Sequence, residues 1–536
     1  MSTPPSPAPP TATPVVATAA TPGAPAASRP RALTALVFFA GIGSMATEIC
    51  ASRLLAPYYG SSTAVWANII GLILVSLSLG YWLGGRLADR HPSQVWLATI
   101  VLIAAALIAS IPFVARPFLD LSVRGIATIS VGAVVGSFAA SLALFAPPVI
   151  LLGMVTPFAV RLAATRVEDA GRTAGRIFAL STAGSIVGTF LPALVTIPLI
   201  GTQRTMLCAA AVIALAALPL LRGRQLVTGI AVAALIGALL ALPPGVIKPQ
   251  AGLLYERESR YQFIQVVQRG PERQLYLNEG HAIHSVWRAD TALTGGEWDM
   301  FLTAPPLLGR PVQRVAILGN AGGTTARAFG VYYPQARIDG VEIDPAVTAA
   351  GRRYFGLGDN PRLTVFTADA RPFLASTGAK YDLILIDAYR QPYVPFYLAT
   401  REFFRLVRSR LAPGGIVALN VSTVPEDHRL ATAIARTLAT EFPQVVTWQA
   451  LTFNQFVVGL TAPQTTSVLR ARLATAPPDL LPDTALFARD LRPAAPARTP
   501  WTDDRAPVEW VTDRMIAAYA LRGAAIPETL LPTAPR

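Results

Sequence analysis

The sequence predicts two unlike halves: an N-terminal all-α polytopic membrane bundle of about seven helices, then a small β-sheet and a Rossmann-like α/β domain. The chain has 536 residues, of which 52% are hydrophobic and only 14% are charged, whereas an average soluble protein carries about 25% charged residues. Residues 1–250 hold 15 Lys and Arg against 5 Asp and Glu, and residues 251–536 hold 30 against 26. Alternating strand and helix patterns occur only in the second part, which is therefore the globular one.

Composition divides the chain into six segments. Residues 1–31 are rich in Pro, Ala and Thr and lack the continuous apolar core of a signal peptide, so we expect a disordered tail there. The other segments are a transmembrane domain at 32–244, a linker at 245–252, a small β domain at 253–310, the Rossmann-like domain at 311–515 and a C-terminal tail at 516–536.

Seven apolar stretches each approach the roughly 20 residues that cross a bilayer as a helix. They lie at about 33–55, 66–88, 96–115, 134–158, 177–200, 205–221 and 226–243. Arginines gather in the N-terminal tail and in the second, fourth and sixth loops, so the positive-inside rule places the N-terminus in the cytoplasm. Seven crossings then place residues 251–536 outside the cell, whereas six or eight crossings would place them inside.

Two ionisable residues, Glu48 and Arg53, lie within the first apolar stretch. Such residues are costly in a membrane and often functional. A transport or ligand role therefore stays open beside a structural polar contact or, for Arg53, snorkelling toward the interface.

The basic balance does not indicate nucleic-acid binding. The only lysines are Lys248 and Lys380, and no run of Lys and Arg with interleaved aromatic residues occurs. Membrane topology explains such dispersed arginine better, and we expect no nucleic-acid partner. Cys50 and Cys208 lack paired spacing and the four histidines lack metal-ligand spacing, so we expect neither a disulfide nor a metal ion.

In the second half, strands are predicted at 314–319, 337–343, 363–367, 381–387 and 415–421, and helical segments separate most of them. This order implies parallel βαβ units in a doubly wound sheet. Ligands of such sheets bind beyond the carboxyl ends of the strands. The residues that end these strands are therefore the candidate site.

Four strand ends carry functional groups. Gly319 and Gly322 form a turn that lets the backbone approach a ligand, and Glu342, about 20 residues further on, can accept both ribose hydroxyls of a nucleoside. Asp369 can accept a hydrogen bond from an adenine amine. Asp387 ends an apolar run and is either a helix N-cap or a catalytic group.

These spacings suit an adenosine-type ligand without the pyrophosphate of a dinucleotide, such as S-adenosylmethionine or a relative. A cationic sulfonium also suits an acidic mouth, which would consist of Glu279, Glu342, Asp369 and Asp387.

Eight motifs in order then show a resemblance that spans residues 253–515. They are ESRYQ (Glu258–Gln262), LYLNEG (Leu275–Gly280), LTGGEWDMF, the glycine turn, VEIDP, the Asp369-Ala370 pair, LIDAY and WTDDRAPVE. This half resembles the spermidine synthase (polyamine aminopropyltransferase) family, and the whole chain resembles its bacterial membrane-fused branch.

The resemblance implies a function. Gln262, Glu342, Asp369 and Ala370 would hold decarboxylated S-adenosylmethionine, a co-substrate, with no other cofactor. Asp387 would be the base that lets an amine such as putrescine attack, which yields spermidine and 5′-methylthioadenosine. We expect a multi-pass protein in the bilayer of the inner membrane, with the catalytic domain in the cytoplasm, where the donor is made. Dimers are common in that family, which leaves a homodimer as an open expectation.

Several positions depart from the family pattern. Ala321 stands where the glycine turn usually has Asp, Arg390 replaces the second acid of an Asp-x-x-Asp element, and Glu297-Trp298 replaces a Tyr-His pair. The candidate acceptor-side residues are Glu279, Trp298, Ala321 and Arg390.

Two explanations of these departures stay open. Either other acids, such as Glu279, Glu297 or Asp299, compensate for the missing ones, or the acceptor is not putrescine. The alternatives are another S-adenosylmethionine-dependent transferase, in which Arg390 recognises an anionic or lipid-borne acceptor, and a polyamine sensor or transporter without turnover.

Overall fold

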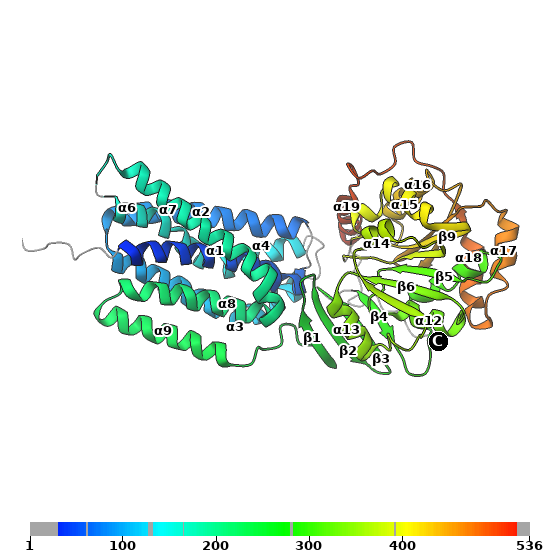
Figure 1. Ribbon diagram of the computed structural model, residues 1–536, viewed down its shortest axis with the longest axis horizontal. Coiled ribbons are helices and arrows are strands. Elements are labelled where there is room, and N and C mark those ends of the chain that lie inside the picture. The colour runs from blue at the N-terminus through cyan, green and yellow to red at the C-terminus, as the bar shows by residue number, and fades with distance from the viewer. Residues whose placement is uncertain are drawn as a thin grey trace, which may run out of the picture.

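A computed structural model describes residues 30–59, 63–126, 132–164, 166–278, 282–390 and 393–521. A helical bundle and an α/β body lie end to end and meet at a narrow neck (Figure 1). The disordered tail was predicted at residues 1–31, and its residues 1–29 lie outside the described residues. The first helix begins at Pro30, within the last two residues of that predicted tail.

The bundle is built around α1 (Pro30–Tyr59). Glycines bring its backbone into contact with that of α7, because a Cβ at Gly184 or Gly188 would collide with the carbonyl of Phe38 or Ile42. Small residues of this kind are typical of helix contacts in lipid. The other elements are α2 (Thr63–Arg90), α3 (Gln94–Ile126), α4 (Gly132–Leu144), α5 (Ala146–Gly153), α6 (Val155–Ala163), α7 (Ala170–Leu191), η1 (Pro192–Thr196), α8 (Ile197–Ala217), η2 (Leu218–Leu220) and α9 (Gly223–Ala241).

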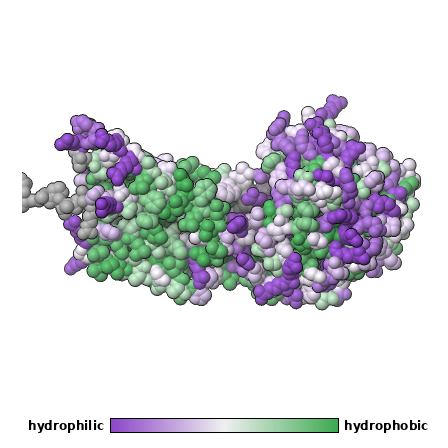
Figure 2. Space-filling view, in the orientation of Figure 1, coloured by the Kyte–Doolittle hydropathy of each residue, from purple (hydrophilic) through white to green (hydrophobic). Residues whose placement is uncertain are grey.

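Six helical segments within the described ranges are long and apolar enough to cross a membrane, judged by length and composition. Their outer surface forms a broad hydrophobic zone (Figure 2). The segment Ala170–Leu220 has 51 residues and is broken at Gly201, whose φ of 81° is not helical and joins two helices. Counted as two, this segment gives seven apolar helical segments in the described chain, as many as the predicted apolar stretches.

Beyond the neck lies a small antiparallel sheet in the order β1-β2-β3-β4, as the strand-like alternation of this segment predicts. Its strands are β1 (Leu253–Glu258), β2 (Phe263–Arg269), β3 (Glu272–Leu277) and β4 (Ile283–Trp287). Strand β4 reaches the larger domain, where Val286 N donates to Thr324 Oγ1 over 2.9 Å. The small sheet therefore lies against the first helix of the α/β domain.

The large sheet has eight strands in the order β12-β10-β11-β9-β8-β5-β6-β7. Strands β5 to β9 are mutually parallel. The chain runs from β5 outward through β6 and β7, then returns to β8 on the other side of β5, so the β5/β8 boundary is a topological switch point where ligands bind. The strands are β5 (Arg314–Leu318), β6 (Arg337–Glu342), β7 (Leu363–Thr367), β8 (Tyr381–Ile386), β9 (Leu411–Ser422), β10 (Gln444–Leu451), β11 (Asn454–Leu460) and β12 (Arg492–Pro493).

Helices cover both faces of this sheet. Alternate residues of β5 point to opposite sides: Leu318 packs in a cluster with residues of α14, α15, α16 and α19, and Ile317 in one with residues of α12, α17 and α18. The helices are α10 (Glu297–Phe301), α11 (Ala304–Leu307), α12 (Thr324–Tyr332), α13 (Pro345–Tyr354), α14 (Ala370–Ser376), α15 (Arg401–Arg410), α16 (Arg429–Leu438), α17 (Thr466–Leu473), α18 (Leu481–Asp490) and α19 (Val508–Leu521).

Two features of this domain differ from the sequence prediction. Strands β10 and β11, which lie between the edge strand β12 and β9, are antiparallel to their neighbours, where only parallel units were expected. Helix α19 continues past residue 516, so the first six residues of the predicted C-terminal tail are helical.

Candidate active site

The glycine turn after β5 holds the ends of β5 and β8 together. Gly319 has a φ of 91°, and a Cβ on it would lie 2.7 Å from the Cα of Ala388 and would collide with the carbonyl of Asp387. Only glycine allows both this backbone conformation and this approach. Gly322 N donates to Ser285 Oγ of β4 over 2.8 Å, so the turn is also fixed from the small sheet.

Glu342 ends β6 with its carboxylate directed at that turn. Its Oε2 accepts from Ala321 N over 3.0 Å, and its Oε1 accepts from Asp344 N over 2.9 Å. Each oxygen keeps further acceptor capacity, which suits two vicinal hydroxyls. Burial raises the pKa of Glu342 to about 7. Ala321, at a φ of 43°, contributes its N–H to this arrangement.

Asp369 follows β7 and is the N-cap of α14, because its Oδ1 accepts from Arg371 N over 2.9 Å. Its Oδ2 accepts from the Tyr397 hydroxyl over 2.7 Å. Ala370 is the first residue of that helix. Asp369 is half-buried, at the carboxyl edge next to Glu342, where Ala368 N donates to Glu342 O over 3.1 Å.

Asp387 follows β8, whose six residues are all buried. Its Oδ1 accepts from Asn420 Nδ2 over 3.0 Å, and burial raises its pKa to about 6. No helix begins directly after Asp387 in the described chain, so Asp387 is not the N-cap that the sequence left open. A carboxyl group held at the switch point with a raised pKa is typical of a general base.

Asn420, near the end of β9, is a site residue that the sequence did not single out. It joins Asp387 to Asn454, whose Nδ2 donates to Asn420 Oδ1 over 3.0 Å. The Tyr389 hydroxyl donates to Asn420 O over 2.9 Å and accepts from Ser422 N over 2.8 Å. A polar side chain at the carboxyl end of the apolar run IVALNV was the available signal.

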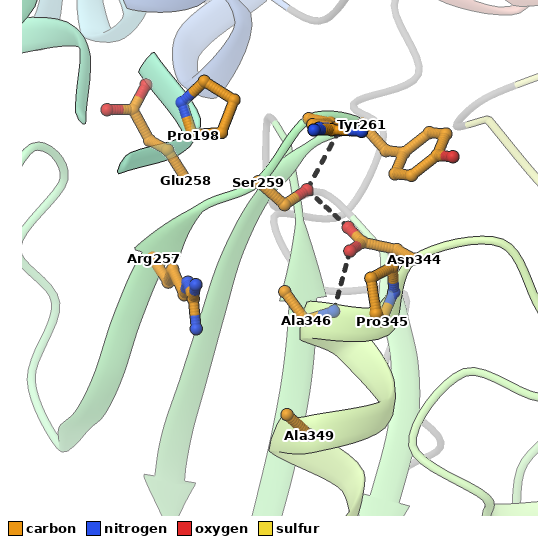
Figure 3. Close-up of a pocket in the computed structure, with 10 residues that line it drawn as sticks. Pro198, Arg257, Glu258, Ser259, Tyr261, Asp344, Pro345, Ala346 and Ala349 are labelled. Atoms are coloured by element: carbon orange, nitrogen blue, oxygen red, sulfur yellow. Dashed lines mark hydrogen bonds between the residues drawn. The ribbon is translucent and has the colours of Figure 1, made fainter. Parts of the chain in front are cut away.

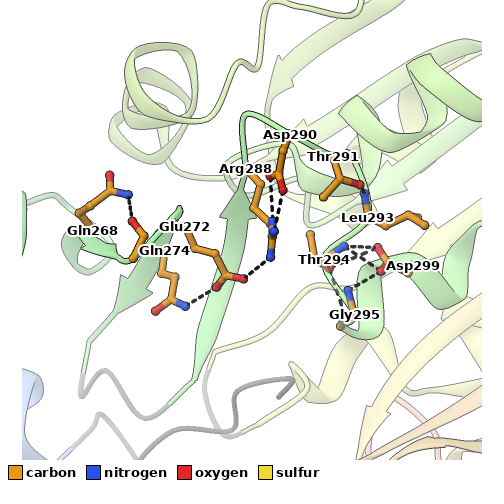
Figure 4. Close-up of polar contacts among 12 residues, drawn as sticks. Gln268, Glu272, Gln274, Arg288, Asp290, Thr291, Leu293, Thr294, Gly295 and Asp299 are labelled. Atoms are coloured by element: carbon orange, nitrogen blue, oxygen red, sulfur yellow. Dashed lines mark hydrogen bonds and ion pairs between the residues drawn. The ribbon is translucent and has the colours of Figure 1, made fainter. Parts of the chain in front are cut away.

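The consecutive residues Glu297, Trp298 and Asp299 of α10 have three different surroundings. Asp299 accepts from Thr294 N at 2.8 Å and from Gly295 N at 2.6 Å, so it stabilises its own loop (Figure 4). Trp298 packs among apolar residues of the small sheet. Glu297 instead faces the site, where burial and the negative charge of Asp387 raise its pKa to about 8. Both acids also act on the hydroxyl of Tyr389.

Two further predicted residues, Gln262 and Arg390, lie around this edge. Gln262 directly precedes β2, and its N–H donates to Ser259 Oγ over 3.0 Å. Arg390 is exposed, and its charge acts on Arg53 and on Tyr397. Glu279 lies outside the described residues. Within the described ranges, no group of three or more His, Cys, Asp or Glu side chains could hold a metal ion.

Together, these features define a Rossmann-like domain that presents carboxylates at the carboxyl ends of β6, β7 and β8, beside the switch point. This is the place where such folds bind nucleosides. Residues 300–462 match the family model described as the spermine/spermidine synthase domain, so this part of the chain is similar to that family.

Two curated relatives have names of the same kind, and one solved structure shows a weaker likeness. A "probable polyamine aminopropyl transferase" of Bifidobacterium longum is 34% identical over 220 residues, covering 39% of this chain and 48% of that protein. A polyamine aminopropyltransferase of Corynebacterium efficiens is 28% identical over 309 residues, covering 51% and 57%. A crystal structure of a probable spermidine synthase from Corynebacterium glutamicum matches at 22% identity with a TM-score of 0.36, covering 43% of this chain and 88% of that one. The chain spans about half the length of the curated relatives it matches.

Proposed function

We propose that the protein is a membrane-bound polyamine aminopropyltransferase. It would move the aminopropyl group of decarboxylated S-adenosylmethionine to an amine such as putrescine and release 5′-methylthioadenosine. The observation that carries the proposal is the position of Asp387, a carboxyl with a pKa raised to about 6 at the switch point of a spermine/spermidine synthase domain. The names of the relatives support the same reaction.

The donor would lie along the ends of β6 and β7. Glu342 would accept the ribose hydroxyls, and the Asp369-Ala370 pair would face the adenine, with Gln262 closing the site from the small sheet. The acids at this edge favour a cationic sulfonium. No metal or further cofactor enters the proposal.

The chemistry needs one proton transfer and one displacement. Asp387 would take a proton from the acceptor ammonium, which frees the nitrogen lone pair. That nitrogen attacks the aminopropyl carbon next to sulfur, a C–N bond forms, and the C–S bond breaks with its electron pair going to sulfur. The sulfonium thereby becomes the neutral thioether of 5′-methylthioadenosine. Much of the rate would come from the alignment of the two substrates, and Asn420 would keep the base in position.

Glu297 is proposed as the second carboxylate for the amine. Of the three acids that could compensate for the missing family acids, Glu279 lies outside the described residues and Asp299 is engaged with Thr294 and Gly295. Glu297 acts electrostatically on the same site as Asp387. A diamine cation between Glu297 and Asp387 would stabilise both ionised carboxylates.

The helical bundle is proposed to span the membrane. Tyr58, near the end of α1, donates to Ile247 O at the neck over 2.9 Å, so α1 begins at the far end, about 45 Å away at 1.5 Å per residue. Because the seven passes alternate in direction, three connecting segments lie at that same end (Figure 1). The described arginines there are Arg31, Arg86, Arg90, Arg161, Arg166, Arg172, Arg176, Arg222 and Arg224.

This distribution of arginines indicates on which side of the membrane the catalytic domain lies. By the positive-inside rule, the arginine-rich end is cytoplasmic, and an odd number of passes then places the catalytic domain on the outer side. The synthesis of the donor favours the cytoplasmic side instead. The charge distribution is the observation made on this chain, and we therefore favour the outer side.

A second candidate function has one specific observation in its favour. The charges of Arg53 and Arg390 act on each other beside the neck, and two neighbouring cations there would suit an anionic or lipid-borne acceptor. Purified full-length protein incubated with decarboxylated S-adenosylmethionine distinguishes the two. Product with putrescine or another polyamine supports the first function, whereas product only with an anionic acceptor supports the second.

A further inference from the structure

The carboxylate of Glu258, in the catalytic half, accepts hydrogen bonds from Thr202 of the helical bundle. Glu258 is the last residue of β1 and the first residue of the segment Glu258–Gln262. We call this segment the donor loop because its last residue, Gln262, is a proposed ligand of the aminopropyl donor. Glu258 Oε2 accepts from Thr202 N over 2.6 Å, and Glu258 Oε1 accepts from Thr202 Oγ1 over 2.5 Å. Thr202 is buried, so this contact is enclosed within the neck.

The contact falls at the one break in a long apolar segment of the described bundle. Gly201 has a φ of 81°, and Thr202 offers the first backbone N–H after that break. A carboxylate is favoured at such a helix N-terminus. A Cβ on Gly201 would lie 3.2 Å from Glu258 Oε2, so the bend and the carboxylate fit each other closely.

A second helix holds the same loop. Arg53, on α1, donates through Nη2 to Arg260 O over 2.5 Å. Residues on both sides of Ser259 are thus fixed to the bundle, Glu258 by α8 and Arg260 by α1. Arg53, one of the two ionisable residues inside the first apolar stretch, therefore has a structural partner in the catalytic half.

Figure 3 shows the hydrogen bond between Ser259 and Asp344, and further hydrogen bonds continue from these two residues to the donor site. Ser259 Oγ donates to Asp344 Oδ2 over 2.5 Å and accepts from Gln262 N over 3.0 Å. Asp344 N donates in turn to Glu342 Oε1 over 2.9 Å. A crevice of about 260 Å³, lined by Pro198, Ser259 and Asp344 among others, lies beside this chain of contacts.

We infer that the bundle positions the donor loop, with Thr202 and Arg53 as positioning residues that act through Glu258 and Arg260 on Gln262 and Glu342. A change at the Gly201 bend would then alter affinity for the nucleoside without touching the reacting atoms. This gives the membrane half a part in catalysis beyond anchoring. The inference rests on the proposed function only in taking Gln262 and Glu342 as nucleoside ligands.

Removal of the Thr202 hydroxyl should release the loop. Burial raises the pKa of Glu258, and the hydrogen bonds from Thr202 counter that effect. Thr202→Val keeps the backbone N–H that donates to Oε2, but it replaces the hydroxyl that donates to Oε1 with a methyl group. The carboxylate then loses part of the compensation for its lost solvent, and it should protonate or move together with the loop. Because α8 keeps its backbone, Thr202→Val leaves the bundle otherwise intact.

The test uses full-length protein in lipid nanodiscs. In Thr202→Val, we expect affinity for 5′-methylthioadenosine, measured by calorimetry, to fall about tenfold, with kcat at saturating donor changed less than about twofold. Hydrogen exchange of the peptide that contains Glu258–Gln262 should speed up without any ligand. Thr202→Ser should restore both readouts. Thr228→Val is the matched control, since Thr228 Oγ1 bonds only Arg224 O of its own helix among the described contacts.

The inference is wrong if Thr202→Val shows the same hydrogen exchange of the donor loop and the same affinity for 5′-methylthioadenosine as the wild type. Equal effects of Thr202→Val and Thr228→Val would overturn it as well. A wild-type protein that binds no 5′-methylthioadenosine would instead contradict the proposed function, while the exchange of the donor loop still decides whether the bundle positions it.

Discussion

Asn420 Nδ2 lies 3.0 Å from Asp387 Oδ1 and joins the carboxyl ends of β8 and β9. A hydrogen bond donated to a carboxylate stabilises its ionised form, and it partly offsets the rise in the pKa of Asp387 that burial causes. The proposed base, Asp387, is therefore oriented by a neighbour that does not itself titrate.

Replacement of Asn420 by Ala should raise the pKa of Asp387 above 6. A hydrogen bond to a charged group contributes about 1.5–3 kcal/mol, which corresponds to about one to two pH units. The acid limb of the kcat/KM profile for amine transfer should move upward by that amount. Gln444→Ala is the control, because Gln444 bonds Gln464 near the opposite edge of the sheet. A profile identical to that of the wild type would exclude this role for Asn420.

Glu297→Gln should weaken binding of the amine more than it slows the reaction. The loss of one charge-assisted contact of about 1.5–3 kcal/mol corresponds to a rise of about 10- to 100-fold in the KM for putrescine. Asp299→Asn, in the neighbouring loop, should lower thermal stability without this effect on KM. If the KM stays unchanged in Glu297→Gln, the second carboxylate lies elsewhere.

Proton release gives an independent view of the same pair. At pH 7, Asp387 is mostly ionised and Glu297 mostly protonated, given pKa values of about 6 and about 8. Binding of an amine cation should draw a proton from Glu297, and this would show as a dependence of the binding enthalpy on the ionisation enthalpy of the buffer. The dependence should disappear in Glu297→Gln, and an absence of proton release from the wild type near pH 7 would contradict the account.

Part of the site could be predicted from the sequence because Glu342 and Asp387 each end an apolar run. Parallel strands bring their carboxyl ends to one edge, so Glu342 and Asp387 could be located without coordinates. Asn420 also lies near the end of an apolar run, but its contact with Asp387 could not be predicted, because that contact depends on the parallel register of β8 and β9, which places Ile386 opposite Leu419.

The sequence was less informative where helices and loops decide the geometry. Glu297, Trp298 and Asp299 are consecutive, yet the turn of α10 sends them to the site, the small-sheet core and the preceding loop. Such a division follows from tertiary packing and not from residue type. Likewise, the break at Gly201 lies between two predicted spans, but its fit to Glu258 depends on a contact between residues 56 positions apart.

The side of the membrane can be measured with fusions to the C-terminus. If the arginine-rich far end is cytoplasmic, the C-terminus lies on the outer side. A fusion to alkaline phosphatase should then be active, and a fusion to green fluorescent protein should not fluoresce. A control fusion after residue 222, at the far end of the bundle, should give the reverse pattern. Fluorescence of the full-length fusion would place the catalytic domain in the cytoplasm and would refute the outer placement.

The most direct test of the central claim is the release of 5′-methylthioadenosine by full-length protein given decarboxylated S-adenosylmethionine and putrescine, followed across pH. We expect product, with a rate that falls as pH drops through about 6, because Asp387 must be ionised to accept a proton. Asp387→Asn should lower the rate by about 10²- to 10⁴-fold and still bind 5′-methylthioadenosine. Wild-type turnover in Asp387→Asn, or no product with any diamine or polyamine, would contradict the account.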